Sequence, residues 1–108
     1  MSDWPKDADG DALRRVAADG SDLSKPMSVD FMVAARDEAS AHAIAATAAA
    51  VGYRVDAQCD DGAWTVYCAR EMLLTYDAVV AAQADLDRIA QPHGGFSDGW
   101  GTFGNRPT

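Results

Sequence analysis

The sequence predicts an α+β sandwich in which two long helices pack on one face of a four-stranded antiparallel sheet. Two observations carry this prediction: apolar residues alternate along short segments, and they recur at helical spacing along two longer ones. After a short leading helix, the expected order is strand, helix, strand, strand, helix, strand, which is the order of ferredoxin-like folds. Each long helix has one apolar stripe, so each needs the sheet to cover it.

The first 28 residues are predicted to form an N-terminal helix and a connecting loop, ahead of a ferredoxin-like domain at 29–104. Asp9 or Asp11 is placed to cap this helix, and Gly20 is placed to end it. Asp7, Asp9 and Asp11 alternate as in a calcium loop. Ala18, however, stands where such a loop carries its bidentate acid, so capping explains the aspartates better. We therefore expect one globular domain and no metal site.

The first strand is expected at 29–35, with alternate residues from Val29 to Ala35 on one face. Asp37 is placed to cap the alanine-rich helix that follows, and Gly52 is placed to end it. The predicted inward stripe of this helix consists of Ala41, Ile44, Ala45, Ala48 and Val51.

A β-hairpin is expected around Asp60-Asp61-Gly62, because apolar and polar residues alternate on both sides of this turn sequence. A simple register pairs Cys59 with about Ala63 and leaves Cys68 too far along the partner strand for a disulfide. We interpret both cysteines as small buried hydrophobic residues.

A second long helix is predicted to begin at Thr75 and to end near Gln91, before Pro92. Asp77, Asp85 and Asp87 fit its solvent-facing side. The fourth strand is expected between Gly95 and Phe103. The inward face of the helix is predicted to contain Tyr76, Val79, Val80, Gln83, Leu86, Ile89 and Ala90.

The charge balance limits the possible partners. The chain has a formal net charge of −8, and no more than two basic residues are adjacent, at Arg14-Arg15. Direct binding to nucleic acid is not expected, because it relies on clustered Lys and Arg. An acidic surface keeps a protein soluble and favours a basic protein partner. No apolar run has transmembrane length and the start lacks signal-peptide features, so a cytoplasmic protein without membrane contact is expected.

No residue pattern predicts an enzymatic site or a cofactor. His42 is expected on the outside of the alanine-rich helix, and His93 in a turn where it bonds a backbone carbonyl. Neither has recognisable zinc spacing to the cysteines, and no nucleophile or paired carboxylate is tied to either. The late glycines precede no helix, so they form no phosphate loop. Tyr67 is an exposed aromatic on a central strand, but the RNP signature of RNA-binding sheets is missing.

The most specific motif is the terminal Ser97-Asp98-Gly99-Trp100-Gly101-Thr102-Phe103. Together with the ferredoxin-like order and the helix that begins near Tyr76-Asp77, it resembles the regulators of ribonuclease E activity, type B, a family of bacterial ribonuclease E inhibitors. Gly52-Tyr53-Arg54-Val55 adds support, and the resemblance extends over about 29–103. It implies a non-catalytic protein that binds the endoribonuclease, or an assembly built on it, and reduces RNA turnover.

The terminal motif supplies the predicted partner-binding residues, although we interpret Trp100 as mainly structural. Two alternatives remain open. One is a small-molecule-binding or enzymatic domain with a cleft at His93 or Asp98. The other is a homodimer whose sheets or edge strands pair. The predicted partner-binding residues are Asp98, Gly99, Trp100, Thr102 and Phe103.

Overall fold

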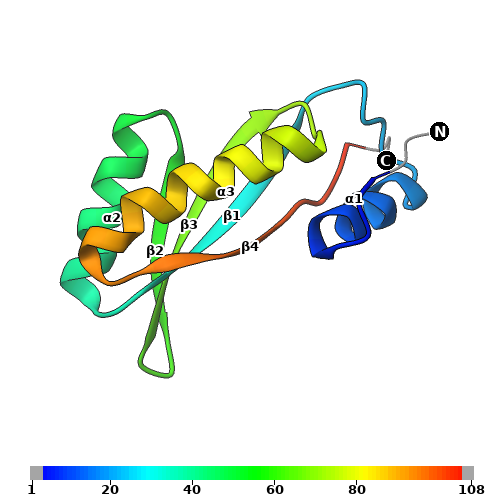
Figure 1. The fold of residues 1–108 in the computed structure, drawn as a ribbon. Helices are drawn as coiled ribbons and strands as arrows, with labels where there is room; N and C mark the ends of the chain where they lie inside the picture. Colours follow the sequence, from blue (N-terminus) through cyan, green and yellow to red (C-terminus); the bar gives the residue numbers. More distant parts are fainter. Residues whose placement is uncertain (1–3, 106–108) are drawn as a thin grey trace.

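The computed structural model describes residues 4–105; Met1–Asp3 of the predicted N-terminal segment and Arg106–Thr108 lie outside the described residues. It has two layers, an antiparallel sheet in the order β2-β3-β1-β4 and two helices, α2 and α3, on one face of that sheet (Figure 1). The predicted ferredoxin-like fold is confirmed. The elements are α1 (Ala8–Ala18), β1 (Met27–Ala35), α2 (Glu38–Ala50), β2 (Arg54–Asp60), β3 (Ala63–Met72), α3 (Tyr76–Ala90), a 3-10 turn (Gln91–His93) and β4 (Phe96–Gly101).

The core lies between the sheet and the two long helices. Strand β1 is central, pairing with β3 on one side and with β4 on the other. Its alternate residues from Met27 to Val33 are buried, as the two-residue period predicts. Each large apolar side chain buried here contributes about 1.5–3 kcal/mol. The helices supply Ala41, Ile44, Ala48, Val79, Ala82, Leu86 and Ala90 to this core.

Two helix positions differ from the predicted inward faces. Val51 is 58% exposed because it is the C-cap of α2, beyond the last turn that packs on the sheet. Val80 is exposed as well, and Ala82 takes the buried place on α3. Asp37 caps α2 as predicted, and Thr75, where the second long helix was predicted to begin, is the N-cap of α3. Each side chain accepts a hydrogen bond from the amide three residues later.

The β2–β3 hairpin turns through Asp61 and Gly62, both with positive φ, which suits the right-handed twist of paired strands. Asp60 therefore pairs with Ala63, and Cys59 pairs with Trp64, one residue from the predicted register. The tip extends beyond the helices (Figure 1). Cys59 is consequently exposed, so its predicted burial is wrong, whereas Cys68 is buried. Both are free thiols, as expected.

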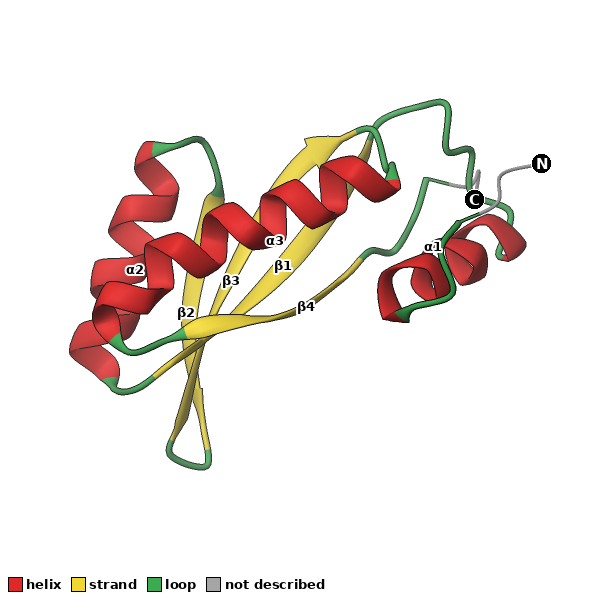
Figure 2. Cartoon of the chain, viewed as in Figure 1, coloured by secondary structure: helices red, strands yellow, loops and turns green. Residues whose placement is uncertain are grey.

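Helix α1 begins two residues earlier than an Asp9 cap would place it, and four residues earlier than an Asp11 cap would. Its cap is Asp7, whose Oδ1 accepts a hydrogen bond of 2.8 Å from the Gly10 amide, and neither Asp9 nor Asp11 serves as the cap. The helix lies beside the end of β4, outside the two-layer sandwich (Figure 2). Leu13 is fully buried, so α1 is anchored to the rest of the molecule by its apolar side. Within the part of the chain that the structure describes, no helix is long and apolar enough to span a membrane.

Candidate protein-interaction surface

Strand β4 contains a β-bulge that sorts the terminal motif onto two faces. Phe31 pairs with Trp100 and Val33 pairs with Ser97, so Asp98 and Gly99 together oppose a single residue of β1. Gly99 has φ +103°, a conformation that residues with a Cβ rarely adopt. The extra residue turns Trp100 toward the helix side of the sheet, while Phe96 points to the opposite side.

Trp100 fastens the N-terminal helix to the sheet. Its half-buried ring packs against the core, and its Nε1 donates a hydrogen bond of 2.9 Å to Asp9 Oδ1. The same carboxylate oxygen accepts a bond of 3.1 Å from Gln83 Nε2 on α3. Asp9, the second residue of α1, thus joins α1, α3 and β4 and does not serve as the helix cap. This arrangement gives the indole the structural role expected of it.

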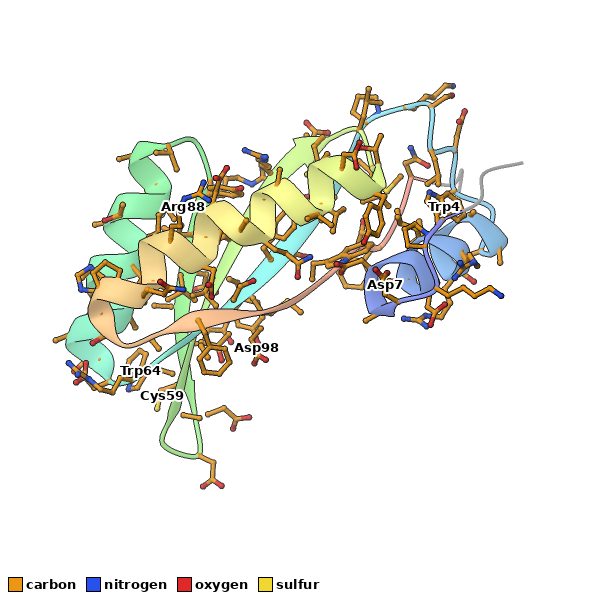
Figure 3. The ribbon with its side chains drawn as sticks, viewed as in Figure 1. Trp4, Asp7, Cys59, Trp64, Arg88 and Asp98 are labelled. Atoms are coloured by element: carbon orange, nitrogen blue, oxygen red, sulfur yellow. The ribbon has the colours of Figure 1, made fainter. Side chains whose placement is uncertain are left out.

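Asp7 makes a second connection between α1 and α3. The Tyr76 hydroxyl donates a hydrogen bond of 2.6 Å to Asp7 Oδ2. This bond, together with that from the Gly10 amide, lowers the pKa of the Asp7 carboxyl below its ordinary 3.8. The same bond raises the pKa of Tyr76 above 10.0. Figure 3 shows Asp7 at the junction between α1 and the body of the protein.

The two shifts predict how pH affects this junction. The Asp7 contribution to stability is present above pH 3.8 and is lost as the pH falls through the lowered folded-state pKa. The Tyr76 contribution is present below pH 10.0 and is lost as the pH rises through its raised pKa. In a carbon-detected NMR titration, Tyr76→Phe is expected to move the Asp7 pKa upward. An unchanged Asp7 titration in this variant would contradict the assignment, and Asp77→Asn provides the matched control.

Residues 102–105 are held against the start of β1 and the loop that precedes it. Thr102 Oγ1 donates a hydrogen bond of 2.6 Å to the Ser28 carbonyl. Asn105 accepts from the Asp22 amide and donates to the carbonyls of Asp22, Lys25 and Pro26. Phe103, between these two anchors, has 99% of its surface exposed. Of the predicted partner-binding residues, Thr102 is tied into the fold and Phe103 projects into solvent.

The sheet face opposite α2 and α3 carries an apolar centre, which we call the open face. Met32 and Tyr67 are paired across β1 and β3, and Ala34 pairs with Phe96 of β4. Phe96 is 54% exposed and Tyr67 is 37% exposed, as predicted for Tyr67. No described helix covers these side chains, since both long helices pack on the other side (Figure 2). Asp98 is exposed on the same strand as Phe96.

Acidic residues surround this apolar centre. Asp30 on β1, Asp56 on β2 and Asp98 on β4 occupy positions whose alternation places them away from the core. Arg54 is the basic residue at one end of this face, and its guanidinium donates a 3.0 Å hydrogen bond to Ser28 Oγ. The open face therefore presents aromatic surface with negative charge around it. The two-residue alternation of β1 predicts that Met32 and Asp30 point away from the core, but no motif in the sequence marks them as part of a site.

Comparison with protein families identifies the chain. The family model described as regulator of ribonuclease activity B matches residues 6–102. The chain belongs to the regulator of ribonuclease activity B family. Direct comparison with curated proteins finds no match. The match begins at residue 6, so it includes α1, which the resemblance seen in the sequence did not. Within the matched segment, the Asp9–Trp100 bond joins α1 to the terminal motif.

Residue types that commonly act in catalysis or metal binding, such as His and Asp, do not gather at one place in this structure. His42 is exposed on α2, with its ring 6.0 Å from that of Trp64. His93 is half-buried in the 3-10 turn and forms no hydrogen bond to a carbonyl in 4–105, contrary to prediction. Asp87, expected in solvent, is half-buried and accepts a bond of 2.9 Å from the Ser97 amide. Within the described part, no three His, Cys, Asp or Glu residues are grouped to hold a metal ion.

Proposed function

We propose that this protein is a non-catalytic regulator that binds a protein partner through the open face. The family is one of regulators of ribonuclease activity, and the partner we propose is ribonuclease E or an assembly built on it. The observation that supports this proposal is the uncovered sheet face, with Phe96, Tyr67 and Met32 at its centre. Protein interfaces characteristically have aromatic and methionine residues at the centre and polar residues at the rim.

Charge indicates the chemistry of the partner surface. Asp30, Asp56 and Asp98 favour a partner segment rich in Lys or Arg, which would also be drawn to the net charge of −8. The same aspartates disfavour the binding of RNA to the open face, because proteins that bind single strands combine aromatic side chains with a positively charged groove. They also oppose two copies of this chain meeting face to face, since like charges would be brought together. A homodimer through edge strands remains a prediction.

The terminal motif contributes to this function mainly by positioning other groups. Asp98 lies on the open face itself, and Phe103 is exposed near the chain end. Gly99 forms the bulge that sends Phe96 and Trp100 to opposite sides. Trp100 and Thr102 secure the strand and the chain end through their hydrogen bonds. We therefore propose Asp98 and Phe103 as contact residues, and Gly99, Trp100 and Thr102 as positioning residues.

Binding of purified ribonuclease E, measured by calorimetry, tests this proposal. Phe96→Ala is expected to weaken binding about tenfold to thirtyfold, because truncating a central aromatic in an interface costs about 1.4–2 kcal/mol. Asp98→Lys is expected to slow association, most strongly at low salt. The matched control is Val80→Ala, an exposed apolar residue on α3 that faces away from the open face.

Three outcomes separate the possibilities. Equal effects of Phe96→Ala and Val80→Ala would exclude the open face as the binding surface. Absence of binding to ribonuclease E by the folded wild-type chain would exclude that partner. Cleavage of RNA by the purified chain would overturn the non-catalytic role. Circular dichroism of each variant distinguishes a lost contact from a lost fold.

A further inference from the structure

A cleft of about 370 Å³ lies on the helix side of the sheet, between the end of α2 and the second half of α3. This volume is within the range of small-molecule pockets. The cleft is separate from the open face, because Arg70 projects toward the helices from β3. Neither His93 nor Asp98 lines it. Figure 3 labels Arg88, which lies on α3 toward α2. The lining residues are Val51, Tyr53, Arg70, Asp85, Arg88 and Ile89.

Tyr53 leaves a polar group in this region without a partner. The residue is only 5% exposed, and its hydroxyl oxygen is buried without a hydrogen bond to any residue of 4–105. Its ring packs edge-on against Phe31, with centroids 6.2 Å apart. A buried phenol normally has a hydrogen-bond partner, because leaving it unpaired costs free energy. An oxygen atom of a bound molecule would supply the partner that is missing.

Arg70 supplies a positive charge over the ring of this tyrosine. Its guanidinium carbon lies 4.6 Å from the centre of the Tyr53 ring. Within residues 4–105, the structure gives Arg70 no hydrogen bond and no ion pair. Arg88 is the second guanidinium of the cleft, and it is paired with Asp85. Two arginines facing one carboxylate make the cleft positive on a chain with a net charge of −8.

In the described part of the chain, the backbone at the end of α2 accepts no hydrogen bond from the guanidinium groups of Arg70 and Arg88. At the end of α2, the Ala48 carbonyl accepts from the amides of Val51 and Tyr53, and the Ala49 carbonyl accepts from Gly52. Neither carbonyl accepts a hydrogen bond from Arg70 or Arg88 within residues 4–105. Val51 and Ile89 provide the apolar walls, and Val51 is one of the residues whose exposure was not predicted.

We propose that this cleft binds a small carboxylate with a short apolar chain. The carboxylate contacts the guanidinium of Arg70 and accepts from the Tyr53 hydroxyl, while the chain packs on Val51 and Ile89. Guanidinium and carboxylate groups match in shape and form two parallel hydrogen bonds. Burial raises the pKa of Tyr53 above 10.0, so at neutral pH the phenol keeps its proton and can donate it. This site is independent of the protein-binding role proposed above.

Titration of the isotope-labelled wild-type chain with butyrate, followed by NMR, tests this site. Shifts are expected at the amides of 51–53 and 88–89 and at the Arg70 Nε–H. Butyramide, which has the same shape without the charge, is expected to produce much smaller shifts. Arg70→Gln is expected to weaken butyrate binding about tenfold or more, because hydrogen bonds to charged groups contribute about 1.5–3 kcal/mol. Tyr53→Phe is expected to weaken binding severalfold while keeping the ring.

Arg54→Gln is the matched control, because it removes a guanidinium from the other face of the sheet. Absence of shifts with butyrate, or equal shifts with butyramide, would overturn the proposal. So would unchanged binding in a folded Arg70→Gln chain. Equal affinity for inorganic phosphate would overturn the choice of a carboxylate. Shifts confined to 51–53, 70 and 88–89 that disappear in Arg70→Gln would support the proposal, whatever the outcome of the ribonuclease E experiment.

Discussion

Gly95→Ala is expected to destabilise the protein by about 3 kcal/mol, because it places a methyl group where backbone and side chains already meet. The added Cβ would overlap the carbonyl oxygen of Ala34 on β1, and it would lie 3.1 Å from Ile44 Cδ1 and 3.3 Å from Ala90 Cβ. The backbone oxygen cannot move aside without disturbing β1, which is the central strand. Urea denaturation followed by circular dichroism measures the loss.

Gly101→Ala, at the far end of the strand that Gly95 precedes, is the matched control for Gly95→Ala. A Cβ at residue 101 meets no atom within 4 Å. The free energy of unfolding of the Gly101→Ala variant is expected to stay within about 0.5 kcal/mol of that of the wild type. If both variants lose the same stability, the close approach at Gly95 is not the cause of its effect.

Trp100→Ala is expected to lower the free energy of unfolding by about 3 kcal/mol, the low end for truncating a buried aromatic, because the indole is half-buried. The change removes the ring from the core and leaves Asp9 without one of its two donors. Trp100→Phe keeps most of the packing and removes the indole N–H, so a loss of about 1 kcal/mol is expected. Urea denaturation compares the two variants.

Amide hydrogen exchange shows which part of the structure is destabilised in Trp100→Ala and Trp100→Phe. The amides of α1 are expected to exchange faster in both, because the indole joins this helix to β4. Exchange in β1 and β3 is expected to change only with the overall stability. Unaltered exchange in α1 would contradict the role assigned to the Asp9–Trp100 bond. Loss of ribonuclease E binding with full stability would instead make Trp100 a contact residue.

The sequence predicted the parts of the fold that depend on local chemistry. Asp37 and Thr75 cap their helices because each side chain reaches an amide three residues along the same segment. The cap of α1 required more than local information, since three alternating aspartates compete for it. The structure has Asp7 as the cap, while Asp9 accepts a hydrogen bond from Trp100, 91 positions away in the sequence.

Alternation along a strand indicates which residues share a face, but not how far the opposite layer extends. Cys59 lies in phase with the dry face of β2, yet it is exposed because the hairpin extends beyond the helices. The β-bulge in β4 likewise makes alternation an incomplete guide to which residues share the open face. Phe96, Asp98 and Trp100 are spaced by two residues and would share one face in a regular strand. Only the paired structure shows that Trp100 lies apart from the other two.

The bulge also decides what a change in the length of β4 would do. Removing Gly99 would leave one residue between Ser97 and Trp100, opposite the single residue between Val33 and Phe31. The pairing would then be regular, with Trp100 still on the helix side and Phe96 and Asp98 still on the open face. Removing both Asp98 and Gly99 would instead turn the indole to the open face and away from Asp9. A single deletion at the bulge would thus leave the two surfaces of the strand as they are, whereas a double deletion would exchange them beyond Ser97.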